Sequence, residues 1–222
     1  MTTSMKRKRT RNKKNEKGVI VVLENASLET IKIDNRNELL NFDSHKKILA
    51  KKGEDISKAR PDIVHLSLLA LLDSPLNKSG KLRIYIHTQK NILIEVNPTI
   101  RLPRTFKRFA GLMVSLLNKR SIYVSESEEV LLRIINNPVT QYFPPKSKIY
   151  HCSYKSEKLV DLTDFIPIVQ KNPTVYVIGA MPHGSLNIDW ADESISVSEY
   201  SLSTQATCAR LCFAYEKFFG IV

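Results

Sequence analysis

Long hydrophobic runs are missing from this sequence. No stretch of about 18 consecutive apolar residues occurs, so a transmembrane helix is not expected. The N-terminus is basic, but no apolar segment follows it, which argues against a secretory signal. Cysteine is scarce as well, because the 222 residues include only three. Three unevenly placed cysteines cannot form a disulfide framework, and this favours a reducing, intracellular compartment.

Several catalytic and nucleotide-binding motifs are also absent. The sequence contains no Gly-x-Ser-x-Gly elbow and no Gly-Lys-Ser/Thr phosphate loop. Cys208 and Cys212 stand four residues apart, but no second pair of Cys or His ligands has a suitable spacing. Two buried apolar cysteines are therefore favoured over a metal pair. The histidines are scattered, and none makes a visible nucleophile–base pair.

Positive charge is present in excess. The chain has 34 Lys and Arg against 22 Asp and Glu, a formal net charge of +12. Its hydrophobic content of 42% and charged content of 25% are those of a globular protein rather than a disordered one. Such a surplus of cations favours a polyanionic partner, either nucleic acid or an anionic membrane.

Much of this charge lies in residues 1–17, which contain eight Lys or Arg and one Glu. The segment lacks periodic apolar positions, so we expect a disordered basic tail followed by one domain over residues 18–222. The tail can act as a nuclear or nucleolar address, as a phosphate-binding arm, or only as a solubilising segment.

The remaining pattern alternates strands with helices, which predicts an α/β fold with a largely parallel sheet. The runs at residues 82–86 and 92–96 predict a hairpin around a turn at 88–91. The segment 35–59 is expected to be helical in parts. Further strands are predicted at 18–23 and 28–33, on either side of a turn at 24–27, and at 148–154 and 174–181. Further helices are predicted at 61–73, 101–117, 127–138, 161–170 and 203–220.

The densest basic cluster is RLPRTFKRFAGLM, residues 101–113. On a helix, Arg101, Arg104 and Arg108 would share a sector of about 60°, opposite the apolar residues that anchor the helix. Arginine suits bidentate recognition of a phosphate or a base edge. No acidic residue occurs between Ile100 and Asn118 to relieve the repulsion, so a phosphate-binding face is favoured over a solvated one.

Two other segments are candidates for a site. The sequence VIGAMPHG (177–184) is a strand that ends in a loop with Gly179 and Gly184, and it is equally compatible with a ligand loop and a plain turn. Arg60 and Asp62 stand at the start of a predicted helix. Asp62 can serve as a general base, can orient a substrate N–H, or can interact with the helix N-terminus, and the last is favoured for the residue taken alone.

Four long motifs together resemble one family, the ribosome-biogenesis pseudouridine-N1 methyltransferases known as the nucleolar essential protein or essential for mitotic growth family. The motifs span residues 60–82, 92–117, 177–184 and 197–208. The resemblance extends from about residue 18 to the C-terminus. It implies a SPOUT-type α/β fold with a C-terminal trefoil knot, a homodimer, and S-adenosyl-L-methionine as cofactor.

The resemblance also assigns roles to individual residues. It implies that Asp62 is the carboxylate beside the target base, and that Arg60, Arg101, Arg104 and Arg108 contact RNA. Pro182 and His183 depart from the small and basic residues common in relatives at these positions. The implied cofactor-binding residues are Cys152, Gly179, Gly184, Val197, Ser198, Glu199, Tyr200, Ser201 and Leu202.

The activity implied by the resemblance is methylation of N1 of a pseudouridine in small-subunit ribosomal RNA, with a role in biogenesis of that subunit in the nucleus and nucleolus. The implied partners are this RNA, a second copy of the chain and proteins of the pre-ribosomal particle, without a membrane or a metal. An RNA-binding assembly factor whose scaffold role dominates over methyl transfer is the alternative. A membrane-surface protein is disfavoured, because no strongly amphipathic lipid-binding helix occurs.

Overall fold

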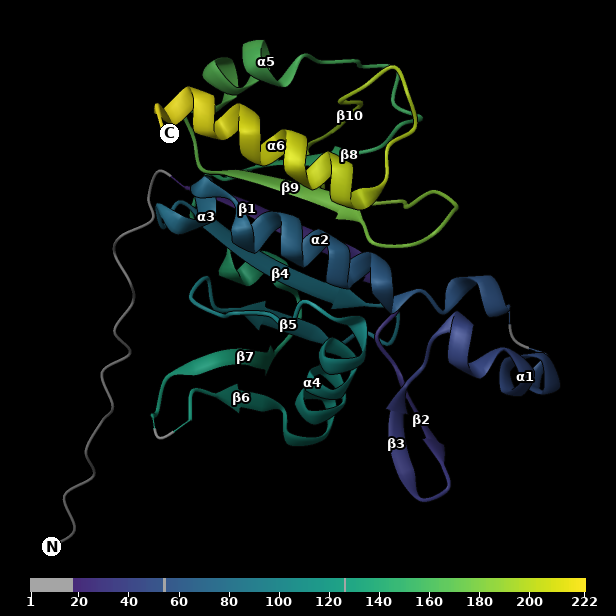
Figure 1. Ribbon diagram of the computed structural model, residues 1–222. Helices are drawn as coiled ribbons and strands as arrows, with labels where there is room; N and C mark the ends of the chain where they lie inside the picture. Colours follow the sequence, from purple (N-terminus) through teal and green to yellow (C-terminus); the bar gives the residue numbers. More distant parts are fainter. Residues whose placement is uncertain (1–17, 54, 126) are drawn as a thin grey trace, which may run out of the picture.

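The structure of the chain is a computed structural model that describes residues 18–222 apart from Glu54 and Glu126. The predicted basic tail, residues 1–17, lies outside the described residues. An eight-stranded sheet forms the centre, in the order β10-β8-β9-β1-β4-β5-β7-β6 (Figure 1). Its strands are β1 (Val19–Ala26), β4 (Leu82–Thr88), β5 (Leu93–Val96), β6 (Ser121–Tyr123), β7 (Val130–Ile135), β8 (Lys148–Cys152), β9 (Thr174–Gly179) and β10 (Glu193–Ile195).

The sheet has a parallel part and an antiparallel part. Strands β10, β8, β9, β1 and β4 are parallel to one another, whereas β5, β7 and β6 are antiparallel to their neighbours. At the centre, Leu23 of β1 pairs with Ile86 of β4 on one side and with Ile178 of β9 on the other. The predicted α/β class with a largely parallel sheet is confirmed. The carboxyl ends of the parallel strands lie at one edge, where such sheets bind ligands.

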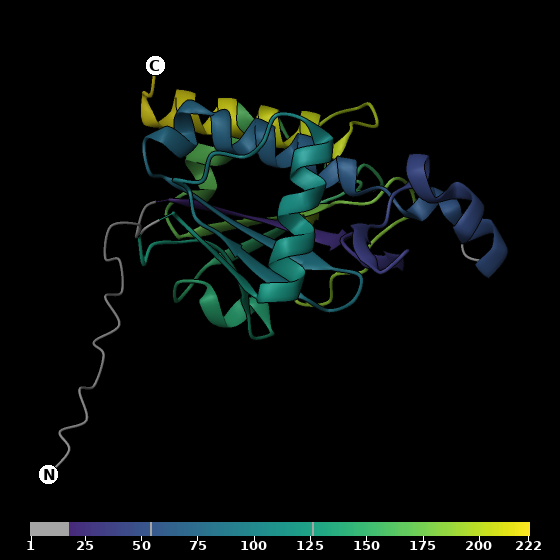
Figure 2. The same cartoon turned by 60° about the horizontal axis from the view of Figure 1, so that its bottom comes forward.

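Helices cover one face of this sheet. Helices α2 and α6 lie side by side over the parallel part, and α4 packs over the antiparallel strands (Figure 2). No helix among the described residues is long and apolar enough to cross a membrane. The helices of this layer are α2 (Pro61–Asp73), α3 (Pro75–Lys78), α4 (Phe106–Lys119), α5 (Leu162–Val169) and α6 (Thr204–Phe219).

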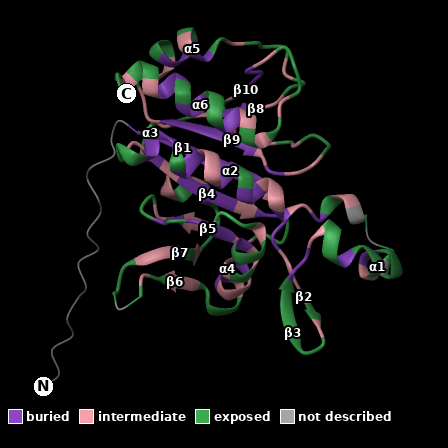
Figure 3. Ribbon diagram, in the orientation of Figure 1, coloured by how far each residue is buried: buried purple, intermediate pink, exposed green. Residues whose placement is uncertain are grey.

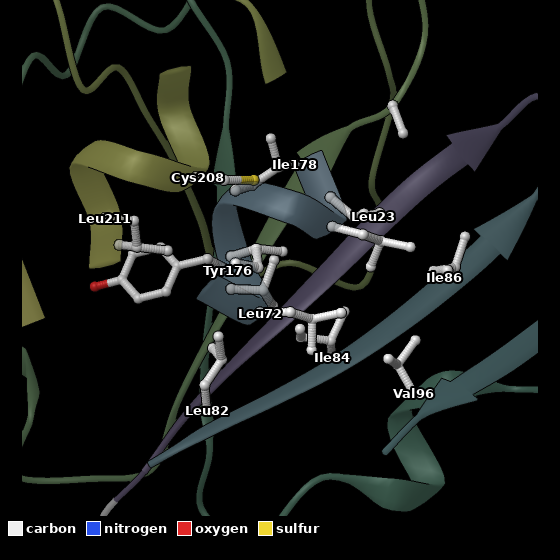
Figure 4. Packing of buried hydrophobic residues seen from close by; sticks show 14 of the residues in the cluster. Leu23, Leu72, Leu82, Ile84, Ile86, Val96, Tyr176, Ile178, Cys208 and Leu211 are labelled. Atoms are coloured by element: carbon white, nitrogen blue, oxygen red, sulfur yellow. The ribbon is translucent and has the colours of Figure 1, made fainter. Parts of the chain in front are cut away.

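The central strands β1 and β9 are buried on both faces (Figure 3), which explains why they are nearly continuous hydrophobic runs. Leu23 belongs to the main core beneath the helices, together with Leu72 of α2 and Cys208 of α6 (Figure 4). Val22 faces the opposite side, where Trp190 and other side chains from loops cover a second, smaller cluster. The predicted burial of the cysteine pair is confirmed, since Cys208 and Cys212 are 0% and 3% exposed.

A small appendage, residues 29–59, projects beyond the edge of the sheet (Figures 1 and 2). Its own core consists of Leu40, Leu49 and Ala59, with Ile31 packed against them. The helix prediction for this segment is correct in part, because it contains a helix but also one strand of a hairpin. The elements of the appendage are β2 (Thr30–Ile33), β3 (Arg36–Leu39), α1 (Phe42–Lys52) and the 3₁₀ turn Ile56–Lys58.

One predicted helix is wrong. Residues 127–138 were expected to be helical, but residues 130–135 form strand β7, which pairs with β5 on one side and β6 on the other. Leu132 turns into the core, while its neighbour Arg133 pairs with Glu95 on the opposite face. Strand pairing on both sides, with β6 just before it in sequence and with β5 about 40 residues away, overrides the local helical pattern.

Helix α6 begins and ends as the sequence predicts. Of the two possible caps, Ser201 and Ser203, the structure uses Ser203, whose Oγ accepts a hydrogen bond from the backbone N–H of Ala206 at 3.1 Å. Gly220 ends the helix with a left-handed φ of +63°. These caps satisfy backbone groups that the helix cannot satisfy internally.

Candidate functional site

A pocket of about 410 Å³ opens at the carboxyl edge of the parallel strands. This volume lies within the roughly 300–1,000 Å³ that ligand pockets occupy. Residues from four parts of the chain line it, namely the start of α2 and three loops that follow strands of the parallel part. These lining segments lie within residues 60–66, 151–154, 178–186 and 196–207.

The first lining loop belongs to the segment 177–184, for which the sequence is equally compatible with a ligand loop and a plain turn. It follows β9 and contributes both Gly179 and Gly184 to the pocket. Gly184 has a φ of +105°, a conformation that side chains other than glycine rarely adopt. The backbone N–H of Ala180 donates to the carbonyl of Glu24 at 2.7 Å, which ties the start of the loop to β1. The loop therefore lines a pocket and is more than a simple turn.

The second lining segment, residues 196–204, passes between two other loops. On one side, the backbone N–H of Val160 donates to the carbonyl of Ser196 at 2.8 Å. On the other side, Oγ1 of Thr204 donates to the carbonyl of Gly179 at 2.6 Å. The 196–204 segment is thus fixed to the loop that follows β8 and to the end of β9.

Most of the predicted cofactor residues line this pocket together. Glu199 is the exception, because it is exposed and is not among the lining residues. Glu199 lies at an exposed bend, where its carboxylate keeps its contact with water. The predicted residues that do line it are Cys152, Gly179, Gly184, Val197, Ser198, Tyr200, Ser201 and Leu202.

Cys152 lies at the end of β8 and contributes a thiol to the pocket wall. Burial raises the pKa of this thiol to about 12. Since the thiolate is the reactive form of cysteine, Cys152 acts here as a small apolar lining residue rather than as a nucleophile.

Arg60 and Asp62 lie together at the rim of the pocket, at the start of α2. The guanidinium donates two hydrogen bonds to the carboxylate, from Nε to Oδ1 at 2.8 Å and from NH2 to Oδ2 at 2.7 Å. These bonds raise the pKa of Arg60 above its ordinary value. Asp62 thus binds an arginine, and helix capping alone does not describe its role. Both side chains remain partly exposed and can meet a ligand at the rim.

The basic cluster differs from its predicted geometry. Helix α4 begins at Phe106, so Arg101 and Arg104 precede it in an irregular segment and do not share a helical face with Arg108. Pro103 keeps the preceding residues out of a helix, because the residue before a proline is disfavoured in the helical conformation. The helix itself begins after Thr105, which has an extended backbone. Arg101, Arg104 and Arg108 are all exposed, as expected for groups that meet a partner.

The expectation that no acidic residue reduces the repulsion among these arginines is wrong in the folded protein. Asp73, at the end of α2, forms an ion pair with the guanidinium of Arg104. The sequence between Ile100 and Asn118 contains no acid, but the fold brings one in from another helix. The predicted anchoring side of α4 is confirmed, since Phe109, Met113 and Leu116 are buried.

His65 is a structural link that the sequence did not identify. Its Nε2 lies 2.8 Å from the carbonyl of Pro103, and its ring stacks on Phe109 with centroids 4.4 Å apart. His65 is one turn beyond Asp62 on α2, so these contacts connect the arginine cluster to the rim of the pocket. A buried polar ring on an otherwise apolar helix face was the available signal.

Comparison with known proteins decides the family. The family model described as EMG1/NEP1 methyltransferase matches residues 21–216 of the chain. The chain belongs to this methyltransferase family. The relatives include the "Ribosomal RNA small subunit methyltransferase NEP1" of Homo sapiens, which is 47% identical over 211 residues, covering 95% of this chain and 86% of that protein. The archaeal Nep1 of Methanothrix thermoacetophila is 36% identical over 162 residues, covering 72% and 70%.

A solved structure agrees with this membership. The crystal structure of Archaeoglobus fulgidus Nep1 bound to S-adenosylhomocysteine has a TM-score of 0.77 and 26% sequence identity to the chain. The similarity covers 91% of this chain and 99% of that one. The resemblance derived from the four sequence motifs is therefore confirmed, and the chain is a methyltransferase.

Proposed function

We propose that the chain methylates N1 of a pseudouridine in small-subunit ribosomal RNA, as part of the biogenesis of that subunit. One observation carries the proposal: the Arg60–Asp62 pair lies at the rim of a glycine-lined pocket, and His65 connects it to an exposed arginine cluster. A rim carboxylate can align a base, and the arginines can bind its phosphates. The relatives named as ribosomal RNA small subunit methyltransferases support the same substrate class.

The methyl donor is S-adenosyl-L-methionine, which supplies a methyl group on a positively charged sulfur, so the transfer needs no metal. The pocket suits such a molecule, because Ile178, Val197 and Leu202 provide apolar surface for an adenine ring and Gly184 lets the backbone approach closely. We assign its binding to these loops, with Cys152 as part of the wall. Residues 18–222 form the methyltransferase domain in this proposal.

A trefoil knot is consistent with the way the 196–204 segment is enclosed. That segment bonds to the loop after β8 on one side and, at the start of helix α6, to the end of β9 on the other. A knot requires the chain to thread through a loop before its final segment, and contacts on both sides of residues 196–204 ahead of the 16-residue helix α6 support such a path. We therefore retain the predicted knot as part of the proposal.

Asp62 has the role of aligning the target base in this proposal. A carboxylate that already binds a guanidinium through both oxygens is fixed in position, yet each oxygen can accept a further hydrogen bond. It can thus accept a hydrogen bond from the N1–H of a flipped pseudouridine and keep N1 in line with the methyl carbon. As the N1–C bond forms, the C–S bond of S-adenosyl-L-methionine breaks, S-adenosylhomocysteine leaves, and the N1 proton is released to solvent. Base flipping explains how a nucleotide in a loop reaches the pocket, and positioning accounts for much of the rate.

We expect Gly184→Val to weaken S-adenosyl-L-methionine binding by about tenfold. Valine is strained at a φ of +105°, and such strain costs about 1–3 kcal/mol, so the loop must change its shape. Titration calorimetry measures the affinity. The matched control is Gly111→Val on α4, where an added Cβ meets nothing within 4 Å. Unchanged affinity in Gly184→Val would remove this loop from the cofactor site.

The proposed activity is tested by incubating the protein with labelled S-adenosyl-L-methionine and small-subunit ribosomal RNA, followed by mass spectrometry of the nucleosides. The expected product is N1-methylpseudouridine. Tight cofactor binding without methyl transfer to any pseudouridine-containing RNA would instead favour the assembly-factor alternative. A methylated nucleoside other than a pseudouridine would contradict the proposed specificity.

The remaining parts of the proposal concern partners and location. Phe213 of α6 and Ile168 of α5 are 68% and 69% exposed, and such apolar side chains support a homodimer through these helices. The basic residues 1–17 suit either a nucleolar address or an RNA-binding arm. We propose that the dimer acts on pre-ribosomal particles in the nucleolus.

A further inference from the structure

A second cleft, of about 460 Å³, lies beside the cofactor pocket, between that pocket and the appendage. Arg60, Asp62, Pro182 and His183 line both spaces, so the two are continuous. A ligand that reacts in the cofactor pocket next to Arg60 and Asp62 can therefore extend into the cleft. A flipped nucleotide is joined to a neighbouring nucleotide on each side. The cleft offers space for one of these neighbours next to the rim of the pocket.

Phe42, the first residue of α1, forms the aromatic wall of this cleft. Phe42 is 36% exposed and is not part of the apolar core of the appendage, which consists of Leu40, Leu49 and Ala59. Burying a phenylalanine stabilises a small core considerably. Phe42 instead lies outside that core and lines the cleft, where its ring is available to a ligand.

The backbone around Phe42 is held in place. Its N–H donates to the carbonyl of Ala59 at 2.8 Å, and the side chain of the preceding Asn41 accepts from the N–H of Ser44 at 2.9 Å. The Nζ of Lys46 lies 5.8 Å from the centre of the ring, which places a cation beside it. An aromatic face with an adjacent cation is the combination that single-stranded nucleic acids bind, through base stacking and phosphate contacts.

The opposite side of the cleft comes from the loop after β9. Nε2 of His183 lies 3.4 Å from Oγ of Ser57, which connects this loop to the appendage. Asp43, next to Phe42, also lines the cleft, and its carboxylate can only accept hydrogen bonds when ionised. The cleft thus combines a flat apolar surface with acceptors suited to the N–H groups of a base edge.

We propose that Phe42 is a stacking platform for a base adjacent to the methylated nucleotide, and that this second cleft is its binding site. The inference rests on the proposed function, since it requires that the target base occupies the neighbouring pocket. Stacking is tolerant of base identity, so Phe42 contributes affinity and position, while the edge contacts of the cleft contribute any preference.

The test uses full-length protein and the shortest stem–loop RNA that the unchanged protein methylates. We expect Phe42→Ala and Phe42→Leu to bind this RNA about tenfold more weakly, and Phe42→Trp to restore binding. Leucine keeps the size and apolar character of the side chain, so a loss in that variant reports on the ring rather than on folding. Tyr123→Ala, which removes an aromatic ring that is 55% exposed on β6, is the control and should bind normally.

A second measurement identifies the base. Each loop nucleotide is replaced in turn by an abasic residue, and binding is measured with the unchanged protein and with Phe42→Ala. If Phe42 stacks on a neighbouring base, removing that base and removing the ring will not be additive, whereas other positions will be. Additive losses at every position, or unchanged affinity in Phe42→Leu, would overturn the inference. Failure of the unchanged protein to methylate any RNA would instead contradict the proposed function.

Discussion

Asp62→Asn is expected to lower the turnover of methyl transfer by about 100-fold or more, while the affinity for S-adenosyl-L-methionine stays unchanged. Asparagine has nearly the same shape as aspartate, but it replaces one acceptor oxygen by an NH2 group and removes the charge. The bidentate contact with Arg60 is then lost, and both side chains can shift. A displacement of about 1 Å in a positioning group can cost about 100-fold in rate.

The measurement is single-turnover methyl transfer at saturating RNA and cofactor, with calorimetry for the cofactor. The matched control is Asp73→Asn, which breaks another Arg–Asp pair of helix α2, the one with Arg104, away from the pocket. We expect near-normal turnover in this control. Near-normal turnover in Asp62→Asn would exclude Asp62 from the mechanism, and a loss of cofactor binding would indicate that it maintains the pocket instead.

The double variant Arg101→Ala with Arg104→Ala is expected to weaken RNA binding on the order of 100-fold. Hydrogen bonds to charged groups contribute about 1.5–3 kcal/mol each, and about 1.4 kcal/mol corresponds to a factor of ten. Removing two phosphate contacts should also make the binding less sensitive to salt. The slope of the logarithm of the binding constant against the logarithm of the salt concentration should become less steep by roughly 0.7 per contact for a single strand. Turnover at saturating RNA should change much less, because neither arginine lines the pocket.

Binding measured between low and moderate salt checks this expectation. Arg133→Ala is the control, since Arg133 pairs with Glu95 on the face of the sheet opposite α4 and should contribute little. An unchanged salt dependence in the double variant would contradict the proposed phosphate clamp. Loss of cofactor binding in the double variant would show that the cluster stabilises the pocket rather than the RNA.

Local sequence patterns predicted the elements whose conformation depends least on contacts with distant parts of the chain. The hairpin of β4 and β5 follows from two alternating runs around a turn, and α6 follows from a serine cap and a glycine stop. Strand β7 was missed because its conformation depends on β5 and β6, which pair with it on both sides. The sequence of residues 127–138 is compatible with a helix as well as with a strand. Pairing with β5 and β6 decides in favour of the strand.

The candidate site shows the same division. The glycine loop, the Arg60–Asp62 pair and the basic cluster were identified as unusual segments, and four long motifs identified the family. The sequence does not show how these segments lie relative to one another in space. His65 joins two of these segments through a contact 38 residues apart in sequence, and no periodicity reports such a contact.

The sequence by itself determined the order of most elements, the excess of arginine in one segment and the membership of a methyltransferase family. The tertiary structure decided that Asp73 balances Arg104, that Glu199 lies outside the pocket, and that Phe42 faces a cleft continuous with it. The physical reason is the range of the interactions. Capping, turns and periodicity act between residues a few positions apart, whereas pockets and ion pairs form between segments that only strand pairing and helix packing bring together.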